Sequence, residues 1–173
     1  MGYYVIIRGP LGSGKSTVAK ELAKIFKCQC IAVDEVLDVN NLTADTEGGY
    51  ISQKSFLKAN KIVAKDACDI LNKGGAIVFD GNFYWKSQID DLIQKLRFQH
   101  YAFTLEAPLN VCIKRDSERA KPHGANATQA VYKKSTEISY GITINADRPV
   151  DQCVNDILSN LPKLESSDRI IVV

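Results

Sequence analysis

A glycine-rich segment near the start of the chain has the residue types and the spacing that bind phosphate groups. Positions 9 to 16 read GPLGSGKS, which satisfies the pattern G-x-x-x-x-G-K-[S/T] at each fixed position. Glycines let successive backbone N–H groups turn inward around phosphate oxygens, and the start of the following helix adds partial positive charge beneath them. We therefore predict a phosphate-binding loop whose nucleotide contacts come from Gly9, Leu11, Gly12, Ser13, Gly14, Lys15, Ser16 and Thr17.

Three polar side chains at the end of this loop have distinct expected roles. Lys15 should reach the β- and γ-phosphates, Ser16 supplies a hard oxygen for Mg²⁺, and Thr17 is placed to bond the α-phosphate. The guanine-selecting signature Asn-Lys-x-Asp is absent, because the Asn-Lys pairs at 60–61 and 72–73 lack the aspartate two residues on. We therefore expect the bound nucleotide to be ATP with Mg²⁺.

An aspartate closes the second predicted strand, at the edge of a parallel sheet where the phosphate loop also lies. A carboxylate at this point, Asp34, can orient an acceptor hydroxyl and accept its proton while the bond to phosphorus forms. The alternative is that Asp34 only caps the next helix. The neighbouring Glu35 and Asp38 are expected to be solvated or to face a substrate.

The third predicted strand also ends in an acid, as strands that help to hold Mg²⁺ in phosphate-loop proteins do. Asp80 follows the apolar run 76–79, and we expect it to hold the metal ion together with Ser16. Asn82 could contact the substrate or phosphate, or could form a turn beside Gly81. The aromatic residues at 83–85 are expected in the core, although they could stack on an acceptor ring.

Two arginines four residues apart follow the fourth predicted strand. On a helix, Arg115 and Arg119 would share one face, and they could close over the triphosphate and stabilise charge on the transferred group. The alternative is an ordinary solvated helix in which Asp116 and Glu118 balance these charges. The loop at 146–149, after the fifth strand, is a candidate border of the adenine.

The elements that must position these residues alternate along the chain. Amphipathic helices separate short β-rich apolar runs, and crossovers of this kind imply a parallel sheet covered on both faces. The sequence therefore predicts an α/β fold with a three-layer α/β/α sandwich. The predicted strands are 3–7, 30–33, 76–79, 101–105 and 142–145, and the predicted helices are 17–26, 56–71, 85–96 and 150–161.

Two stretches interrupt this alternation and could act as mobile flaps over a site. Residues 37–50 are polar and end in two glycines, and residues 120–127 hold a proline and a glycine between helical segments. At the other end, the β-branched run at 168–173 could add one more strand at a sheet edge. No repeat or linker marks a boundary, so we expect a single domain over residues 1–173.

Composition excludes several classes of function. The 22 basic and 20 acidic residues nearly cancel, so no overall field favours nucleic acid or a membrane as the main partner. The start of the chain leaves no room for a signal-peptide core, and we expect a cytoplasmic protein whose five cysteines are reduced thiols. Cys28 and Cys30 suggest a zinc site, but neither histidine of the chain has ligand spacing to them.

Taken together, GPLGSGKST, the strand-end Asp34, VFDGN and KRDSERAKPHG resemble small P-loop kinases of the nucleoside-monophosphate-kinase-like group. The nearest patterns are those of polynucleotide 5′-hydroxyl kinase, chloramphenicol phosphotransferase, zeta-toxin and adenylylsulfate kinase domains. This resemblance implies a five-stranded sheet of order 2-3-1-4-5, Asp34 as the base, and a short lid at about 115–127 that carries Arg115 and Arg119. The segment 37–50 matches none of these families closely enough to name an acceptor.

The leading hypothesis is transfer of the γ-phosphoryl group of Mg-ATP to a hydroxyl of a small-molecule or nucleotide-like acceptor. A second hypothesis is a regulatory or assembly ATPase with a protein or RNA partner, which would be indifferent to Asp34→Asn. A third acceptor, the 5′ end of a nucleic acid, ranks below a small molecule because the overall charge is nearly neutral.

Overall fold

A five-stranded parallel sheet organises the chain, for which the computed structural model describes residues 2–162. The central strand, β1, is an apolar run whose side chains are almost all buried, as expected for a strand covered on both faces. The strand order is β2-β5-β1-β6-β7, which confirms the predicted order 2-3-1-4-5. The strands are β1 (Tyr3–Arg8), β2 (Gln29–Ala32), β5 (Ala76–Gly81), β6 (Gln99–Glu106) and β7 (Ile142–Asn145).

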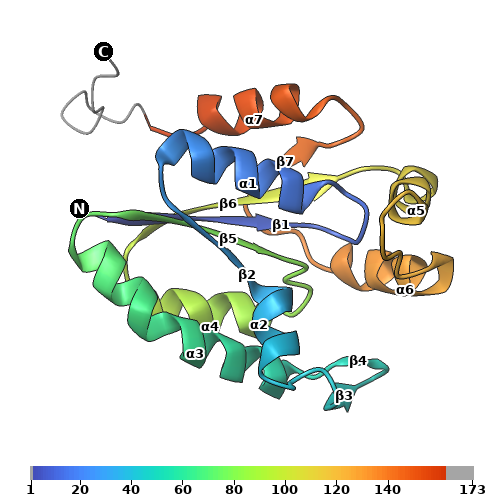
Figure 1. Ribbon diagram of the computed structural model, residues 1–173, viewed down its shortest axis with the longest axis horizontal. Coiled ribbons are helices and arrows are strands. Elements are labelled where there is room, and N and C mark those ends of the chain that lie inside the picture. The colour runs from blue at the N-terminus through green and yellow to red at the C-terminus, as the bar shows by residue number, and fades with distance from the viewer. Residues whose placement is uncertain (1, 163–173) are drawn as a thin grey trace.

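Helices cover both faces of the sheet, so the predicted three-layer sandwich is confirmed (Figure 1). One face packs against α1 (Lys15–Phe26) and α7 (Val150–Ser159). The other face packs against α3 (Gln53–Asn72) and α4 (Lys86–Leu96). Both layers bury the apolar stripes that the sequence predicted, and both cores are built from strand and helix side chains together.

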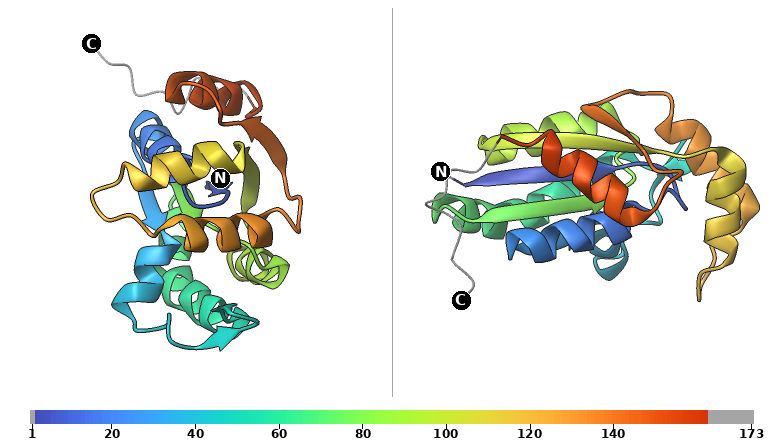
Figure 2. Two further views of the ribbon diagram at one scale, coloured as in Figure 1. Left: turned by 90° about the vertical axis from the view of Figure 1, so that its right-hand side faces the viewer. Right: turned by 90° about the horizontal axis from the view of Figure 1, so that it is seen from above.

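Shorter elements lie at the carboxyl edge of the sheet. They are α2 (Val33–Val39), the hairpin of β3 (Thr46–Glu47) and β4 (Tyr50–Ile51), α5 (Leu109–Ser117) and α6 (Ala125–Ser135). Figure 2 (left) looks onto this edge and shows α5 and α6 lying across it, with α2 and the hairpin to one side. The two predicted flap stretches therefore contain ordered structure, including a hairpin within residues 37–51.

Four of the five predicted strands differ from the structure by one or two residues at one or both ends, and the difference at the second strand changes the position of a candidate site residue. The second strand ends at Ala32, and Val33 begins α2 instead of closing the strand. Val33 is apolar like the strand before it because it still packs into the core, now as a helical residue that is 2 % exposed. Asp34 is consequently a first-turn helical residue instead of a strand-end residue. The run at 168–173 lies outside the described residues.

A buried arginine ties the sheet edge together. Arg8, the last residue of β1, is fully buried and donates to the carbonyl oxygens of Phe83, Ile138 and Ser135 and to Thr104 Oγ1, at 2.8 to 3.3 Å. Burial lowers its pKa to about 10. Its position at the C-terminus of α6 also matches the negative end of that helix. Arg8 thus fixes α6 relative to the strand that enters the glycine loop.

No helix within residues 2–162 is long and apolar enough to span a membrane.

Candidate active site

The glycine loop between β1 and α1 has the backbone geometry that its sequence predicts. Gly12 and Gly14 adopt φ values of 74° and 90°, which side-chain-bearing residues rarely adopt. A Cβ at Gly12 would lie 2.1 Å from the carbonyl oxygen of Cys112, so steric contact also requires glycine there. The loop leads directly into α1, whose N-terminus is built from Lys15 and the two hydroxyl residues that follow it. This arrangement fits a phosphate group at a helix N-terminus.

Asp80 lies beside this helix start because β5 pairs with β1. The register places Asp80 opposite Ile7, two residues before the loop begins, and its side chain is 5 % exposed. Burial raises the pKa of Asp80, while the charge of Lys15 and a hydrogen bond from Ser16 lower it. Its Oδ1 has no hydrogen-bond partner among the described residues. Ser16 and Asp80 therefore form an oxygen pair that fits Mg²⁺ with its water ligands.

Asp34 lies close enough to Lys15 for the two charges to interact. In α2 the N-cap is Ala32, so Asp34 is the second helical residue and does not cap the helix. Its Oδ2 accepts a hydrogen bond from Asn82 Nδ2 at 3.3 Å. Burial raises the pKa of Asp34, the charge of Lys15 lowers it, and the negative charge of Asp80 raises it further. A partly buried carboxylate of this kind is suited to accept a proton.

The residues after β5 form the wall beside Asp34. Phe83 is fully buried with φ of 45°, a conformation that costs energy for a bulky residue, and Arg8 holds its carbonyl oxygen. Tyr84 packs edge-on against Phe56, and Trp85 Nε1 donates to the carbonyl oxygen of Ile51 in the hairpin. As predicted, the rings of Phe83 and Tyr84 belong to the core, and Trp85 lies at its edge.

A cavity of about 450 Å³ opens on the nucleotide side. It is bounded by the glycine loop and the first turn of α1, by Arg115 and Arg119, and by residues 146–150. Arg115 Nη1 donates to the carbonyl oxygen of Ala146 at 2.8 Å, which joins α5 to the loop after β7. The structure therefore brings together the phosphate loop, the two arginines and the predicted adenine border.

The arginines do not share one helical face. The helix α5 ends at Ser117 with Glu118 as its C-cap, so Arg119 follows the helix instead of continuing it. Both side chains still border the same cavity. Spacing alone could not show that the helix ends at Ser117, because the residues that typically end a helix, Pro122 and Gly124, come later in the sequence.

Asp116 organises the lid loop, a role that the sequence did not indicate. It is 1 % exposed and accepts hydrogen bonds at 2.9 Å from the backbone N–H groups of His123 and Gly124 and from His123 Nδ1. Burial opposes ionisation of Asp116, but these hydrogen bonds lower its pKa overall. Helical spacing from the buried Cys112 places Asp116 on the inner face of α5, which is the signal that could have identified it.

Comparison with known proteins gives consistent matches over most of the chain. Residues 5–138 match the family AAA_33, described as an AAA domain. The chain is 28 % identical over 141 residues to shikimate kinase from two strains of Staphylococcus epidermidis, which covers 74 % of this chain and 75 % of that protein.

Solved structures share the fold at low sequence identity. A sugar kinase from Janibacter sp. superposes with a TM-score of 0.77 at 17 % identity, covering 92 % of this chain and 94 % of that one. A gluconokinase from Sinorhizobium meliloti gives 0.71 at 16 % identity, with coverages of 90 % and 89 %. The APS kinase of Mycobacterium tuberculosis, solved with AMPPNP and APS, gives 0.64 at 16 % identity, with coverages of 91 % and 96 %.

Proposed function

The chain belongs to the AAA_33 family of P-loop proteins, and on this premise we propose that it transfers the γ-phosphoryl group of ATP to a hydroxyl of a small-molecule or nucleotide-like acceptor. Its kinase relatives support an ATP-dependent small-molecule kinase. The observation that carries the proposal is Asp34, whose carboxylate interacts with the charge of Lys15 in the phosphate loop and accepts a hydrogen bond from Asn82.

The nucleotide side binds and neutralises the triphosphate. Backbone N–H groups of residues 9–17 and the N-terminus of α1 hold the phosphates, and Lys15 contacts the β- and γ-phosphates. Ser16 and Asp80 would hold Mg²⁺, which supplies positive charge to the β- and γ-oxygens when bound. The base of ATP occupies the cavity between Arg115 and the loop at 146–150.

The acceptor side activates the hydroxyl. Asp34 accepts a hydrogen bond from the acceptor hydroxyl, and a hydrogen bond from Asn82 orients the carboxylate. The hydroxyl oxygen forms a bond to the γ-phosphorus, the bond from that phosphorus to the bridging oxygen breaks, and ADP leaves with the electron pair. The proton of the hydroxyl passes to Asp34, whose raised pKa favours this transfer.

The lid contributes charge during transfer. Arg115 is held at the cavity by its bond to Ala146, and Arg119 follows on the loop that Asp116 closes. Their guanidinium groups are placed to stabilise the charge on the transferred group as water is excluded. We expect closure of residues 115–127 to precede chemistry.

The experiment is ADP release from Mg-ATP by wild type and Asp34→Asn in the presence of pooled acceptors. The pools are nucleosides, sugars, amino alcohols and 5′-hydroxyl oligonucleotides. A kinase shows release that one pool stimulates and that Asp34→Asn abolishes. Slow release that is equal in both proteins and indifferent to every pool would instead identify a regulatory ATPase.

A further inference from the structure

The segment that covers the acceptor side carries only one sign of charge. From residue 28 to residue 53 the chain has five acids and no lysine, arginine or histidine, although basic residues slightly outnumber acids overall. We call this stretch the acidic segment; it contains β2, α2 and the hairpin. Its acids are Asp34, Glu35, Asp38, Asp45 and Glu47.

Among these acids, Asp38 lies on the same face of α2 as Asp34, and its side chain has no hydrogen-bond or ion-pair partner within residues 2–162. Asp38 lies one helical turn after Asp34, is exposed, and is among the charges that raise the pKa of Asp34. Glu35 acts instead on Asp80, at the metal side. The two hairpin acids are already bonded, Asp45 to Ser52 and Glu47 to Gln53.

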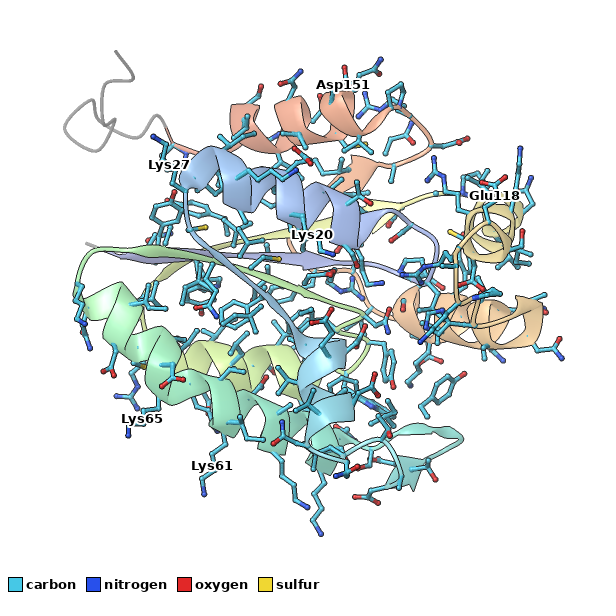
Figure 3. The ribbon with its side chains drawn as sticks, viewed as in Figure 1. Lys20, Lys27, Lys61, Lys65, Glu118 and Asp151 are labelled. Atoms are coloured by element: carbon cyan, nitrogen blue, oxygen red, sulfur yellow. The ribbon has the colours of Figure 1, made fainter. Side chains whose placement is uncertain are left out.

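The cations near the acceptor side are committed elsewhere. Lys15 and His123 are the groups that lower the pKa of Asp34; Lys15 serves the phosphates, and His123 is bonded to Asp116. Lys134 forms an ion pair with Glu137 and lies 4.2 Å from the centre of the Trp85 ring. On the neighbouring helix α3, Lys61 and Lys65 point away from the sheet (Figure 3).

A buried hydrogen-bond acceptor at the same place lacks a donor. Asn82 is 8 % exposed, and its Oδ1 has no hydrogen-bond partner among residues 2–162. The orientation of this amide is fixed by chemistry, because the reversed amide would turn its oxygen toward the carboxylate of Asp34. A buried oxygen without a donor is costly unless a ligand supplies one. A hydroxyl or ammonium group of a ligand on this side of the site would supply that donor.

We propose that the acceptor is a neutral or amine-bearing polyol, and not a carboxylate, phosphate or sulfate ester, with Asp38 selecting for the amine. The inference rests on the proposed kinase function and narrows it. An anionic acceptor would face Asp34 and Asp38, and Lys15, the lysine that acts on Asp34, is already engaged with the phosphates; like charges at close range disfavour binding. Gluconate and shikimate, which the names of two relatives carry, are carboxylates and are predicted not to be acceptors here.

The experiment uses matched acceptors and acceptor-dependent ADP release. Glucose, glucosamine and glucuronate share one pyranose skeleton with a neutral, a cationic and an anionic substituent. They are assayed beside pools sorted in the same way: polyols and nucleosides, aminocyclitols and amino alcohols, and hydroxy acids including shikimate. Stimulation by a neutral or cationic pool, and none by the anionic pools, is the expected result.

Charge variants of Asp38 test the selecting residue. Asp38→Asn should raise the KM of the cationic acceptor about 3- to 10-fold and change that of its neutral analogue less than about 2-fold. Asp38→Lys should abolish the preference for the cationic acceptor over its neutral analogue and allow an anionic analogue to bind. Neither change should harm folding, because an acid in the last turn of a helix is unfavourable. The matched control is Asp69→Asn, an exposed acid near the C-terminal end of α3, which should leave every KM unchanged.

The outcomes separate the two levels of the proposal. If an anionic pool gives the highest turnover and Asp34→Asn abolishes it, the kinase function stands and the inference on acceptor charge is overturned. Equal effects of Asp38→Asn on neutral and cationic acceptors would remove the selecting role of Asp38. If no pool of any charge stimulates ADP release, the proposed function fails and the inference fails with it.

Discussion

The nucleotide side and the acceptor side of this site are built in opposite ways. The nucleotide side comes mainly from one continuous segment, in which β1, the glycine loop and α1 follow each other without a break. The acceptor side is assembled from α2, the hairpin, the turn at 82–85 and the lid, which are far apart in the chain. A local motif can specify the first side, whereas the second depends on tertiary packing. The same fold can therefore keep its nucleotide chemistry while its acceptor changes.

Arg8 connects the two sides. It immediately precedes the glycine loop, and its guanidinium bonds the turn after β5 through Phe83 and the end of α6 through Ser135. The buried charge has no carboxylate partner at salt-bridge distance among the described residues and is satisfied by oxygen acceptors alone. Its removal should therefore affect both sides at once, unlike changes confined to either one.

On the nucleotide side, the largest expected effect comes from Gly12→Ala. A Cβ there would overlap the Cys112 carbonyl oxygen at 2.1 Å, and the φ of 74° disfavours any side chain. We expect ATP affinity to fall more than about 100-fold, measured with a fluorescent ATP analogue. The control is Gly48→Ala in the hairpin, where the φ of 60° is also left-handed but a Cβ would meet nothing within 4 Å, so the comparison isolates the steric overlap at Gly12. Retained affinity in Gly12→Ala would contradict the assigned phosphate loop.

Arg8→Met should destabilise the whole fold. The change leaves buried oxygens of Thr104, Phe83 and Ser135 without their donor, which costs about 3 kcal/mol or more. Urea unfolding followed by circular dichroism measures the loss. The conservative variant Arg8→Lys, which keeps one donor group, should recover part of it. A change below about 0.5 kcal/mol would show that Arg8 does not connect the two sides.

Arg119→Ala should separate turnover from binding. Its guanidinium borders the nucleotide cavity, and we expect it to act on the transferred group rather than on bound ATP. Turnover should fall about 30- to 100-fold while ATP affinity changes less than about 3-fold. Lys121→Ala on the same loop is the control. If affinity alone fell, the transition-state role of Arg119 would be wrong.

Asp116→Asn should have the smallest effect and the clearest pH dependence. Because the folded pKa of Asp116 is lowered, its contribution to stability is full above the unfolded pKa and is lost as pH falls through the folded value. The variant should therefore be less stable than wild type by about 1 kcal/mol near pH 7. The difference in unfolding free energy should shrink below about pH 4. A difference that is independent of pH would exclude an ionised Asp116.

The sequence predicted the helical layers through local patterns, and the sheet order through its resemblance to small P-loop kinases. Apolar runs and helical spacing identified the strands and the long helices, and the glycine motif identified the phosphate loop at residue resolution. The errors occurred where packing decides the outcome. Val33 could extend a strand or begin a helix while staying equally buried, and Arg119 lies beyond a helix end that no local signal marked.

Several residues of the site were not predicted at all, for the same reason. Asp116 was considered only as an acid of a solvated helix and Arg8 was given no role, since a sequence does not show that a charge is buried until its partners are known. The partner of Asp116, His123, follows a turn in the chain. The partners of Arg8 lie on other elements, at residues 83, 104, 135 and 138. Such networks are long-range and cannot be read from spacing.

The most direct test of the division between the two sides compares two quantities in the same variant, Asp34→Asn. ATP affinity and acceptor-stimulated ADP release are measured against wild type, each at saturating Mg²⁺. If Asp34 acts on the acceptor, affinity for ATP stays within about 3-fold while stimulated release falls more than about 1000-fold. Stimulated release that survives in Asp34→Asn, or a parallel loss of ATP affinity, would contradict the assignment of Asp34 to the acceptor side.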